Sequence, residues 1–510
     1  MFEWIYALLI APLAVSVLCF LIAKSKNQAL CTALHITGLV LMLVFSLKTV
    51  ALVLAQEKIL ALDNWIYIDS LSAIFIGLIG IVGFLAGLYS IGYMKTELEQ
   101  GHLDFQNYAN YHGFLHLFFF TMLLSVTTNN IILMWVGIEA TTLSSAFLVG
   151  TYKQKTSLEA AWKYIIICSV GVAFGLYGTI LTFSNANSLL SDPTQAIFWS
   201  EIRAHAGNLS PNIMHFAFAF ILLGFGTKCG LFPMHTWLPD AHSEAPSPVS
   251  GILSAVLLNC AMLVVLRYFI LTSQAVGNDY PQMLMTVFGL LSVGVACFFI
   301  VAQRDIKRKL AYSSIENMGL ISFAFGLGGP LGVFAGLLHT ITHSFAKALL
   351  FCASGNILLK YKSRDMNRIS GLWKTMPMTA LLFGCGVLAL AGVPPFGLFV
   401  SEFAIVVAGI SAGKTWLVIL CLIFLTIVLA GLTTMVLKTV LGKPSEDIAA
   451  GEPNKLSVII FAVFLIILFM LGVHIADPIL HLLKASVAIV LNPNVSFGDM
   501  QLLPWQVLGQ

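Results

Sequence analysis

Apolar residues occupy most of the chain in long continuous runs, and polar residues gather in the short segments between them. A membrane-spanning helix needs about 20 apolar residues, and these runs provide that length. Because the runs are continuous rather than alternating, the pattern argues against a transmembrane β-barrel. It predicts an all-α polytopic membrane protein. About fourteen transmembrane helices are expected, near residues 3–23, 29–54, 70–94, 112–128, 131–150, 160–183, 212–232, 248–271, 282–302, 312–328, 331–358, 376–412, 415–441 and 456–476.

Proline interrupts two of these runs, at 230–239 and within 391–402. Proline removes a backbone donor, and exposed backbone at membrane depth is tolerated only within protein or beside a water-filled cavity. The breaks lie roughly five spans apart, an arrangement typical of inverted repeats and ion sites in transporters. We expect interrupted helices 7 and 12 and two inverted five-helix repeats, at about 112–271 and 282–441. Two ordinary proline kinks are the alternative.

The composition fits a single membrane domain. Hydrophobic residues make up 59% of the chain and charged residues 10%, whereas a soluble domain is roughly 25% charged. Because so little of the chain lies between the runs, residues 1–480 are assigned to one transmembrane domain and 481–510 to a C-terminal tail. The modest apolar stretches of the tail leave open whether it lies along the outer surface or against a neighbour.

Basic residues are distributed unequally between alternate loops. If the N-terminus faces outward, the outer loops hold little beyond Lys58, Arg203 and Lys414, and most other basic residues lie in inner loops. Inner loops of membrane proteins are enriched in lysine and arginine, so we predict an N-terminus outside. The first run has basic residues after it rather than before it, which indicates a retained span. The net charge of +3 belongs to these loops and does not indicate nucleic-acid binding.

The nine cysteines are scattered through apolar segments, and no two form a C-x-x-C pair. Metal or iron–sulfur ligation therefore has no support in the sequence. The chain also has no Walker loop and no dinucleotide-binding fingerprint. We expect no cofactor and no metal site in this chain.

Ionisable side chains occur inside or beside the apolar runs. Placing one in hydrocarbon costs at least about 2.5–3.5 kcal/mol, so such groups are rare and usually line an ion path. A chain that carries several of them is expected to move ions. The candidate proton-transfer residues are Glu139, Lys163, Lys228, His235, His242, His339, His343, Lys347 and Glu402.

Lysine and glutamate together can control a proton. The approach of a carboxylate favours the charged lysine, and its withdrawal in an apolar setting favours release of the proton. Lys228 precedes the first break, and Glu139 lies about two turns into its span. Lys163 lies about one turn inside the inner boundary, where its side chain could instead reach the interface. A packing role is the alternative for Glu139.

His339, His343 and Lys347 are spaced by four residues, which places them on one helical face about 6 Å apart along the axis. Histidine titrates nearest neutrality, so a proton relay fits best. A core histidine pair and a metal site are the alternatives, although no third ligand is nearby.

The remaining candidates lie beside the breaks. His235 and His242 are either a point of proton uptake or solvated loop residues, while Asp240 and Glu244 are expected to be loop acids. Glu402 follows the second break and is expected to be the acid on the exit side. The alternative is that Glu402 caps the second half-helix, since helix N-termini favour negative charge.

Residues 226–249, 305–319 and 343–351 closely resemble the antiporter-like membrane subunits of respiratory complex I, multisubunit cation/proton antiporters and membrane-bound hydrogenases. The resemblance covers roughly residues 1–480. Residues 254–262, which include Asn259, together with SerIleGluAsnMetGly, are similar to component F of hydrogenase-4 and formate hydrogenlyase-type complexes.

This resemblance implies a subunit that translocates protons, or alternatively Na⁺, across a bacterial or archaeal cytoplasmic (inner) membrane. Energy would come from peripheral hydrogenase or dehydrogenase subunits, because this chain has no redox centre of its own. Further partners would be other antiporter-like membrane subunits and the lipid bilayer. The family roles carried over are those of the paired Glu139 and Lys228, the lysine of the sixth span (Lys163), the central axis (His339, His343 and Lys347) and the terminal acid (Glu402).

Asn259 departs from the complex I pattern, in which lysine or histidine is typical at this position. An amide cannot hold a transferable charge, so water, or His235 and His242, would have to connect the two halves. This residue keeps a non-conducting scaffold open as an alternative. The chain could also be the equivalent subunit of an NADH:quinone oxidoreductase or a cation/proton antiporter, or a coupling subunit for an inorganic-carbon uptake partner.

Overall fold

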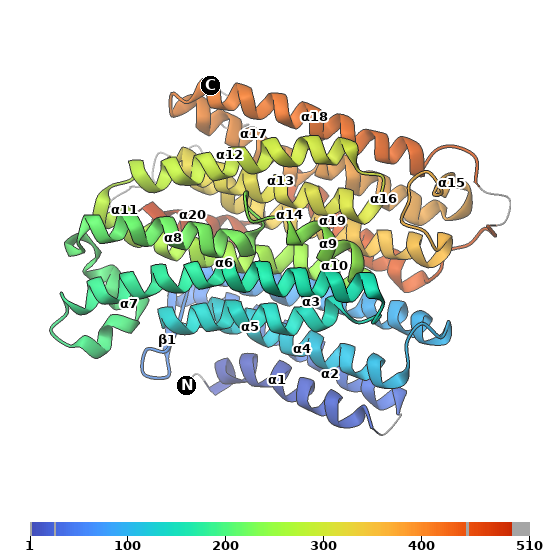
Figure 1. Ribbon diagram of the computed structural model, residues 1–510, viewed down its shortest axis with the longest axis horizontal. Coiled ribbons are helices and arrows are strands. Elements are labelled where there is room, and N and C mark those ends of the chain that lie inside the picture. Colours follow the sequence, from blue (N-terminus) through green and yellow to red (C-terminus); the bar gives the residue numbers. More distant parts are fainter. Residues whose placement is uncertain (1–2, 25–26, 445–447, 492–510) are drawn as a thin grey trace.

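The computed structural model describes residues 3–24, 27–444 and 448–491 as a bundle of side-by-side helices (Figure 1). Within these residues, eleven helices are long and apolar enough to cross a membrane. The helices at the predicted spans are α1 (Glu3–Ile22), α2 (Gln28–Gln56), α3 (Ser70–Glu99), α4 (Phe105–Thr127), α5 (Ile131–Val149), α6 (Lys155–Asn187), α8 (Pro211–Cys229), α11 (Leu258–Val276), α12 (Asp279–Ala302), α13 (Ile306–Leu327), α14 (Gly329–Tyr361), α16 (Pro377–Leu390), α17 (Gly397–Ser411), α18 (Thr415–Thr439) and α19 (Lys455–Val473).

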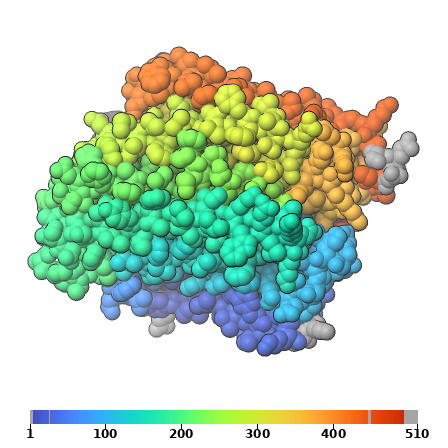
Figure 2. Space-filling view, in the orientation of Figure 1, coloured from blue at the N-terminus to red at the C-terminus, as the bar shows by residue number. Residues whose placement is uncertain are grey.

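The predicted all-α architecture of a polytopic membrane protein is confirmed. Helices α4 and α13, of 23 and 22 residues, fall within the length range of the eleven apolar helices but carry more polar residues, and α16 and α17 are two shorter apolar helices at the predicted twelfth span. In the space-filling view, successive parts of the chain appear as adjacent bands across one face of the molecule (Figure 2). The smaller elements are η1 (Pro193–Ile197), α7 (Trp199–Ala204), η2 (Ala206–Asn208), α9 (Trp237–Glu244), α10 (Ser247–Ile252), the π-helical η3 (Leu253–Leu257), α15 (Leu372–Thr375) and α20 (Asp477–Leu491).

Both predicted helix breaks are present. Helix α8 ends at Gly230, whose φ of 77° is a left-handed conformation that favours glycine, and α9 begins at Trp237. The indole of Trp237 donates to the Thr227 carbonyl at 2.9 Å, which satisfies an acceptor left unpaired by the end of α8. The second break separates α16 from α17, and each break contains a cis X–Pro bond.

Two long segments form the centre of the bundle. The segment formed by α10, η3 and α11, and helix α14, are each fully buried over their most apolar stretch. Helix α14 packs against α13, α16, α17 and α19, so it contacts most of the second half of the molecule. Helix α20 crosses the predicted boundary at residue 480 and packs against α3 and α14. The described part of the predicted tail therefore belongs to the domain, and residues 492–510 lie outside the described residues.

A β-hairpin precedes α3. Strands β1 (Lys58–Ala61) and β2 (Ile66–Asp69) pair antiparallel, and Asp69 then caps α3 by accepting from the Ser72 amide at 2.9 Å. Arg267 of α11 donates to both oxygens of Asp69, at 2.6 and 2.7 Å, and both side chains are buried. Burial opposes ionisation of Asp69, but Arg267 and the Ser72 amide outweigh it and hold the pKa of this carboxyl below its usual range.

We expect Asp69→Asn to lower the free energy of unfolding by about 3–5 kcal/mol, because it leaves the Arg267 charge buried without a partner. Asparagine is also a good N-cap, so the loss reports the ion pair rather than the cap. Denaturant unfolding in detergent measures the difference. Asp104→Asn is the control, because exposed Asp104 caps α4 in the same way. Equal stability of the two variants would contradict the assigned role of the ion pair.

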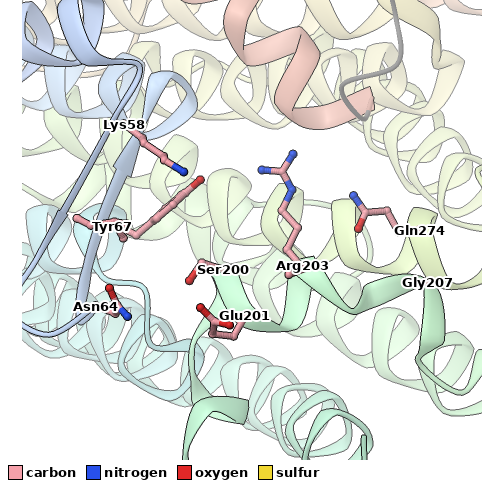
Figure 3. Close-up of a pocket in the computed structure, with 10 residues that line it drawn as sticks. Lys58, Asn64, Tyr67, Ser200, Glu201, Arg203, Gly207 and Gln274 are labelled. Carbon is pink, nitrogen blue, oxygen red and sulfur yellow. The ribbon is translucent and has the colours of Figure 1, made fainter. Parts of the chain in front are cut away.

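The two basic residues Lys58 and Arg203, both expected on the outer side, meet in space. They line a cavity of about 760 Å³ together with Tyr67, Ser200, Glu201 and other residues of the hairpin and α7. Figure 3 shows the Lys58, Tyr67 and Arg203 side chains extending into the same space. None of the predicted proton-transfer residues lines this cavity.

Candidate proton-transfer site

Lys228 is fully buried near the end of α8 and is held by hydroxyl groups. Its ammonium group donates to Thr142 Oγ1 at 2.8 Å and to the Tyr164 hydroxyl at 2.5 Å. The Tyr164 hydroxyl also lies 2.7 Å from Ser145 Oγ. Helices α5 and α6 thus supply neutral hydrogen-bond partners for a cation that lies inside an apolar bundle.

Glu139 lies one turn before Thr142 on α5, and its carboxylate is bound by Ser169, whereas the ammonium of Lys228 is bound by Thr142 and Tyr164. Ser169 Oγ of α6 donates to Glu139 Oε1 at 2.7 Å, while Oε2 is buried without a hydrogen-bond partner among the described residues. Glu139 lies three residues before Thr142, which binds Lys228, so both residues are on the same face of α5. The structure therefore shows Glu139 and Lys228 apart, each with its own hydrogen-bond partners, as expected for a carboxylate that would approach the lysine only in another conformation.

Lys163 is placed differently from the sequence-based expectation. Its side chain is 48% exposed and pairs with Glu159 at 2.7 Å and Asp240 at 3.4 Å. The next residue, Tyr164, occupies the face of α6 that meets Lys228. A shift of one residue rotates the side chain by about 100° around a helix, so Lys163 points to the surface. The structure does not bring Lys163 into the buried group.

The two histidines at the first break are buried, so their interpretation as solvated loop residues is wrong. His235 lies between α8 and α9, and its Nδ1 has no partner among the described residues. His242 lies on α9 with both ring nitrogens unpartnered among those residues and its ring edge against Phe351 of α14. The acids expected in this loop, Asp240 and Glu244, pair with this chain's own Arg308 and Arg364.

Asn259 lies at the start of α11 and is fully buried. It follows the π-helical segment η3 and donates from Nδ2 to the Ala255 carbonyl and to Ser344 Oγ, both at 2.8 Å. Its Oδ1 is buried without a partner among the described residues. Ser344 follows His343 on α14, so the amide contacts the helix that carries the predicted central axis.

Lys347 lies fully buried on α14 and is bound by α13. Its ammonium donates to the Leu310 carbonyl at 3.0 Å and to Ser313 Oγ. One turn earlier on α14, His343 has two buried ring nitrogens without partners in the described part of the chain. Lys347 and His343 therefore keep hydrogen-bonding capacity that water or a moving side chain can use.

His339 connects two further helices. Its Nε2 lies 3.0 Å from Asn317 Oδ1 of α13, and its Nδ1 lies 2.9 Å from Ser401 Oγ of α17. The Asn317 amide in turn donates to the buried carboxylate of Glu316. Glu402 follows Ser401 and lies in apolar surroundings with Leu320 and Phe323. Helix α17 has no side-chain cap, so the alternative role of Glu402 as a helix cap is not observed.

Several groups that connect these residues are not identifiable from the sequence alone. Glu316 is the exception, because a carboxylate within a predicted span (312–328) is the same signal that identifies Glu139. The hydroxyl and amide partners carry no such signal, because isolated serine, threonine and tyrosine are common in helices. The missed partners are Thr142, Ser145, Tyr164, Ser313, Asn317 and Ser344.

A cluster of three buried histidines was also missed. His112 and His116 lie one turn apart on α4, and His116 Nε2 is 2.9 Å from Nδ1 of His35 on α2. The rings of His35 and His112 are 4.2 Å apart. The i, i+4 spacing on α4 was the available signal, and only tertiary packing supplies the third ring. No group of three or more histidine, cysteine or acidic residues in the described ranges is arranged to hold a metal ion.

The fold and this row of buried titratable groups define a helical membrane protein of the ion-translocating type. Residues 128–429 match the family described as NADH:quinone oxidoreductase/Mrp antiporter, transmembrane. Residues 58–105 match the N-terminal family of complex I chain 5. The chain belongs to this family of antiporter-like membrane subunits.

Individual relatives agree with this assignment. The hydrogenase-4 component F homolog of Methylacidiphilum infernorum is 40% identical over 419 residues, covering 82% of this chain and 87% of the relative. NADH-quinone oxidoreductase subunit L of Mycobacterium tuberculosis is 34% identical over 358 residues, covering 69% of this chain and 53% of the relative. The expected resemblance to hydrogenase-4 component F is thus confirmed.

Solved structures share the fold. A chain of the archaeal membrane-bound sulfane sulfur reductase aligns with a TM-score of 0.85 at 23% identity, over 95% of this chain and 97% of its own length. A chain of the Mrp complex from Dietzia aligns with a TM-score of 0.85 at 18% identity, over 97% and 98%. The chain therefore has the same fold as these two subunits.

Proposed function

We propose that this chain translocates protons as one membrane subunit of a redox-driven complex of the hydrogenase-4 or formate hydrogenlyase type, with Na⁺ as the alternative ion. The observation that carries the proposal is the set of polar and ionisable groups inside the apolar bundle, with Lys228, Asn259 and Lys347 fully buried and Glu402 partly buried. The 40% identity to a hydrogenase-4 component F homolog supports the choice of complex. Peripheral hydrogenase subunits would supply the redox chemistry, in a cytoplasmic membrane with the N-terminus outside.

In the first half, Lys228 would hold the proton. Its ammonium is stabilised by the hydroxyls of Thr142 and Tyr164. Because these partners are neutral, they do not hold the lysine permanently in its protonated form. Movement of Glu139 toward Lys228 would favour the charged lysine, and movement away would favour release. Ser169, which binds the Glu139 carboxylate, would hold it in the separated position.

In the second half, the proton would pass from Lys347 toward Glu402. Ser313 binds Lys347, while hydrogen bonds join Glu316, Asn317, His339 and Ser401, the residue before Glu402. Asn317 is an amide, so it would orient Glu316 and His339 without carrying the proton, and water would bridge the titratable groups. Neutral imidazole both donates and accepts, so His339 can receive a proton on one nitrogen and release another from the opposite side.

The two inverted repeats, at about 112–271 and 282–441, are part of the proposal. Helices α5 and α13 would be equivalent, and each carries a glutamate at a similar depth: Glu139 is the ninth residue of α5 and Glu316 the eleventh of α13. The α8–α9 and α16–α17 breaks would likewise correspond. Asn259 would lie where the repeats meet and orient hydrogen bonds without carrying charge.

Glu139→Gln tests conduction against the scaffold alternative. We expect the native complex in vesicles to lose most of its proton translocation, because glutamine keeps the shape of the side chain but cannot influence Lys228 by its charge. Proton uptake per turnover of the redox partner is the measurement. Intact partner activity without pumping in the unmodified complex, and no effect of the substitution, would instead favour a scaffold.

The subunits that co-purify with the chain distinguish the parent complexes. A nickel–iron hydrogenase large subunit is expected. Flavin- and NADH-binding subunits would instead favour the complex I-like alternative, and their absence together with other antiporter subunits would favour a cation/proton antiporter.

A further inference from the structure

A cavity of about 320 Å³ lies at the end of α3 opposite to the hairpin. Both halves of the molecule contribute to its walls, through α3, α9, the first turn of α13 and the end of α14. The polar and ionisable side chains lining it are Glu97, Gln100, His102, Tyr152, Gln154, Ser243, Glu244, Lys307, Lys362 and Arg364. The proposed function assigns no role to this cavity.

Glu97 and His102 form a hydrogen-bonded pair at the boundary between solvent and the protein interior. His102 is 52% exposed, whereas the Glu97 side chain is 7% exposed, and His102 Nδ1 lies 2.9 Å from Glu97 Oε2. Glu99, two residues further along the same helix, is 63% exposed and pairs with Lys95 at the surface. Burial of Glu97 removes water from its carboxylate, and this loss of solvation costs free energy that a surface position would not cost.

The inner wall of the cavity leads to the central axis. Lys307 is buried and donates to the Ala245 carbonyl at 2.5 Å. One and two turns further along α13, Leu310 and Ser313 bind the ammonium of Lys347. The ring of His242 lies 5.4 Å from that of Phe351, one turn after Lys347 on α14, and its two ring nitrogens are unpartnered among the described residues. Ionisable groups therefore continue from the cavity to the axis.

A purely structural role explains part of this arrangement. Lys307 and Arg364 bind carbonyls at the C-terminal end of α9, where cations are favourable. That role does not account for Glu97. It lies within ion-pair distance of neither cation, and its hydrogen bond is made to a half-exposed histidine.

We propose that this cavity is the opening through which protons reach Lys347 from this face, and that His102 and Glu97 collect them. His102 would accept a proton from water on Nε2 and pass the proton on Nδ1 to Glu97. The carboxyl would then release it toward Lys307 and His242. The inference rests on the proposed function. The charged and titratable groups facing the pair are Tyr152, Glu244, Lys307, Lys362 and Arg364.

The test uses the native complex in vesicles and compares Glu97→Gln with Glu99→Gln. Glu97→Gln is expected to slow proton translocation about tenfold, less than the 10²–10⁴ typical of a positioned acid–base group, because Glu244 also lines the cavity. Glu99→Gln is expected to leave the rate unchanged. An unchanged rate in Glu97→Gln would overturn the proposal.

Rescue separates proton collection from a structural role. Inorganic phosphate carries a proton near neutral pH, so phosphate supplied on the cavity side is expected to restore most of the rate of Glu97→Gln. Absence of rescue, or rescue only from the opposite side, would overturn the proposal. Lys347→Ala is measured in parallel, since it is expected to resist rescue. If Lys347→Ala instead pumps normally, the proposed function fails, independently of the Glu97 result.

Discussion

Lys228→Ala is expected to abolish proton translocation by the native complex in reconstituted vesicles. The alanine removes the buried cation that Thr142 and Tyr164 bind, and no other lysine lies in that group. A positioned proton-transfer group typically contributes 10²–10⁴ in rate, so a fall of at least about 100-fold is expected. The measurement is the initial rate of proton uptake at a fixed turnover of the redox partner.

Two further variants make this result specific. Lys228→Arg keeps the positive charge, but the guanidinium group of arginine does not lose its proton in proteins. This variant is therefore expected to assemble but not to pump if proton exchange at this position is required. Lys163→Ala removes an exposed lysine that pairs with Glu159 and Asp240, and it should pump nearly normally. Pumping at full rate in Lys228→Ala would show that the assignment of Lys228 is wrong.

The second large effect is expected from Lys347→Ala. In the proposed path Lys347 connects the first half to the groups near Glu402, so its loss is expected to uncouple the two halves and lower the number of protons moved per electron. The ratio of proton uptake to electron transfer measures this. Lys309→Ala is the control, because Lys309 is also buried but donates to the Gly431 carbonyl of α18. An unchanged ratio in Lys347→Ala would refute a role in the central axis.

The sequence was informative where one physical effect dominates. Continuous apolar runs predicted the spans, because every backbone polar group in a bilayer must be satisfied within a helix. Proline predicted both breaks for the same reason. Buried charges such as Lys228 and Lys347 were identifiable because their cost in an apolar helix requires an explanation.

Other features depend on which helix faces which. Lys163 and Tyr164 are consecutive residues of α6 and lie on different faces of this helix. Sequence spacing alone does not fix which of these faces meets α8. The burial of His242 follows from contact with Phe351, more than a hundred residues away. The row through Asn317 and His339 likewise requires α13, α14 and α17 to be placed together. These contacts come from packing, which the one-dimensional pattern does not encode.

The central claim is that this chain carries protons when its partners perform redox chemistry. The most direct measurement is the internal pH of vesicles that contain the purified native complex, recorded as the redox reaction is started. The account predicts a pH change that a protonophore abolishes, that a sodium ionophore leaves intact, and that Lys228→Ala removes. Full redox turnover without any pH change would contradict it.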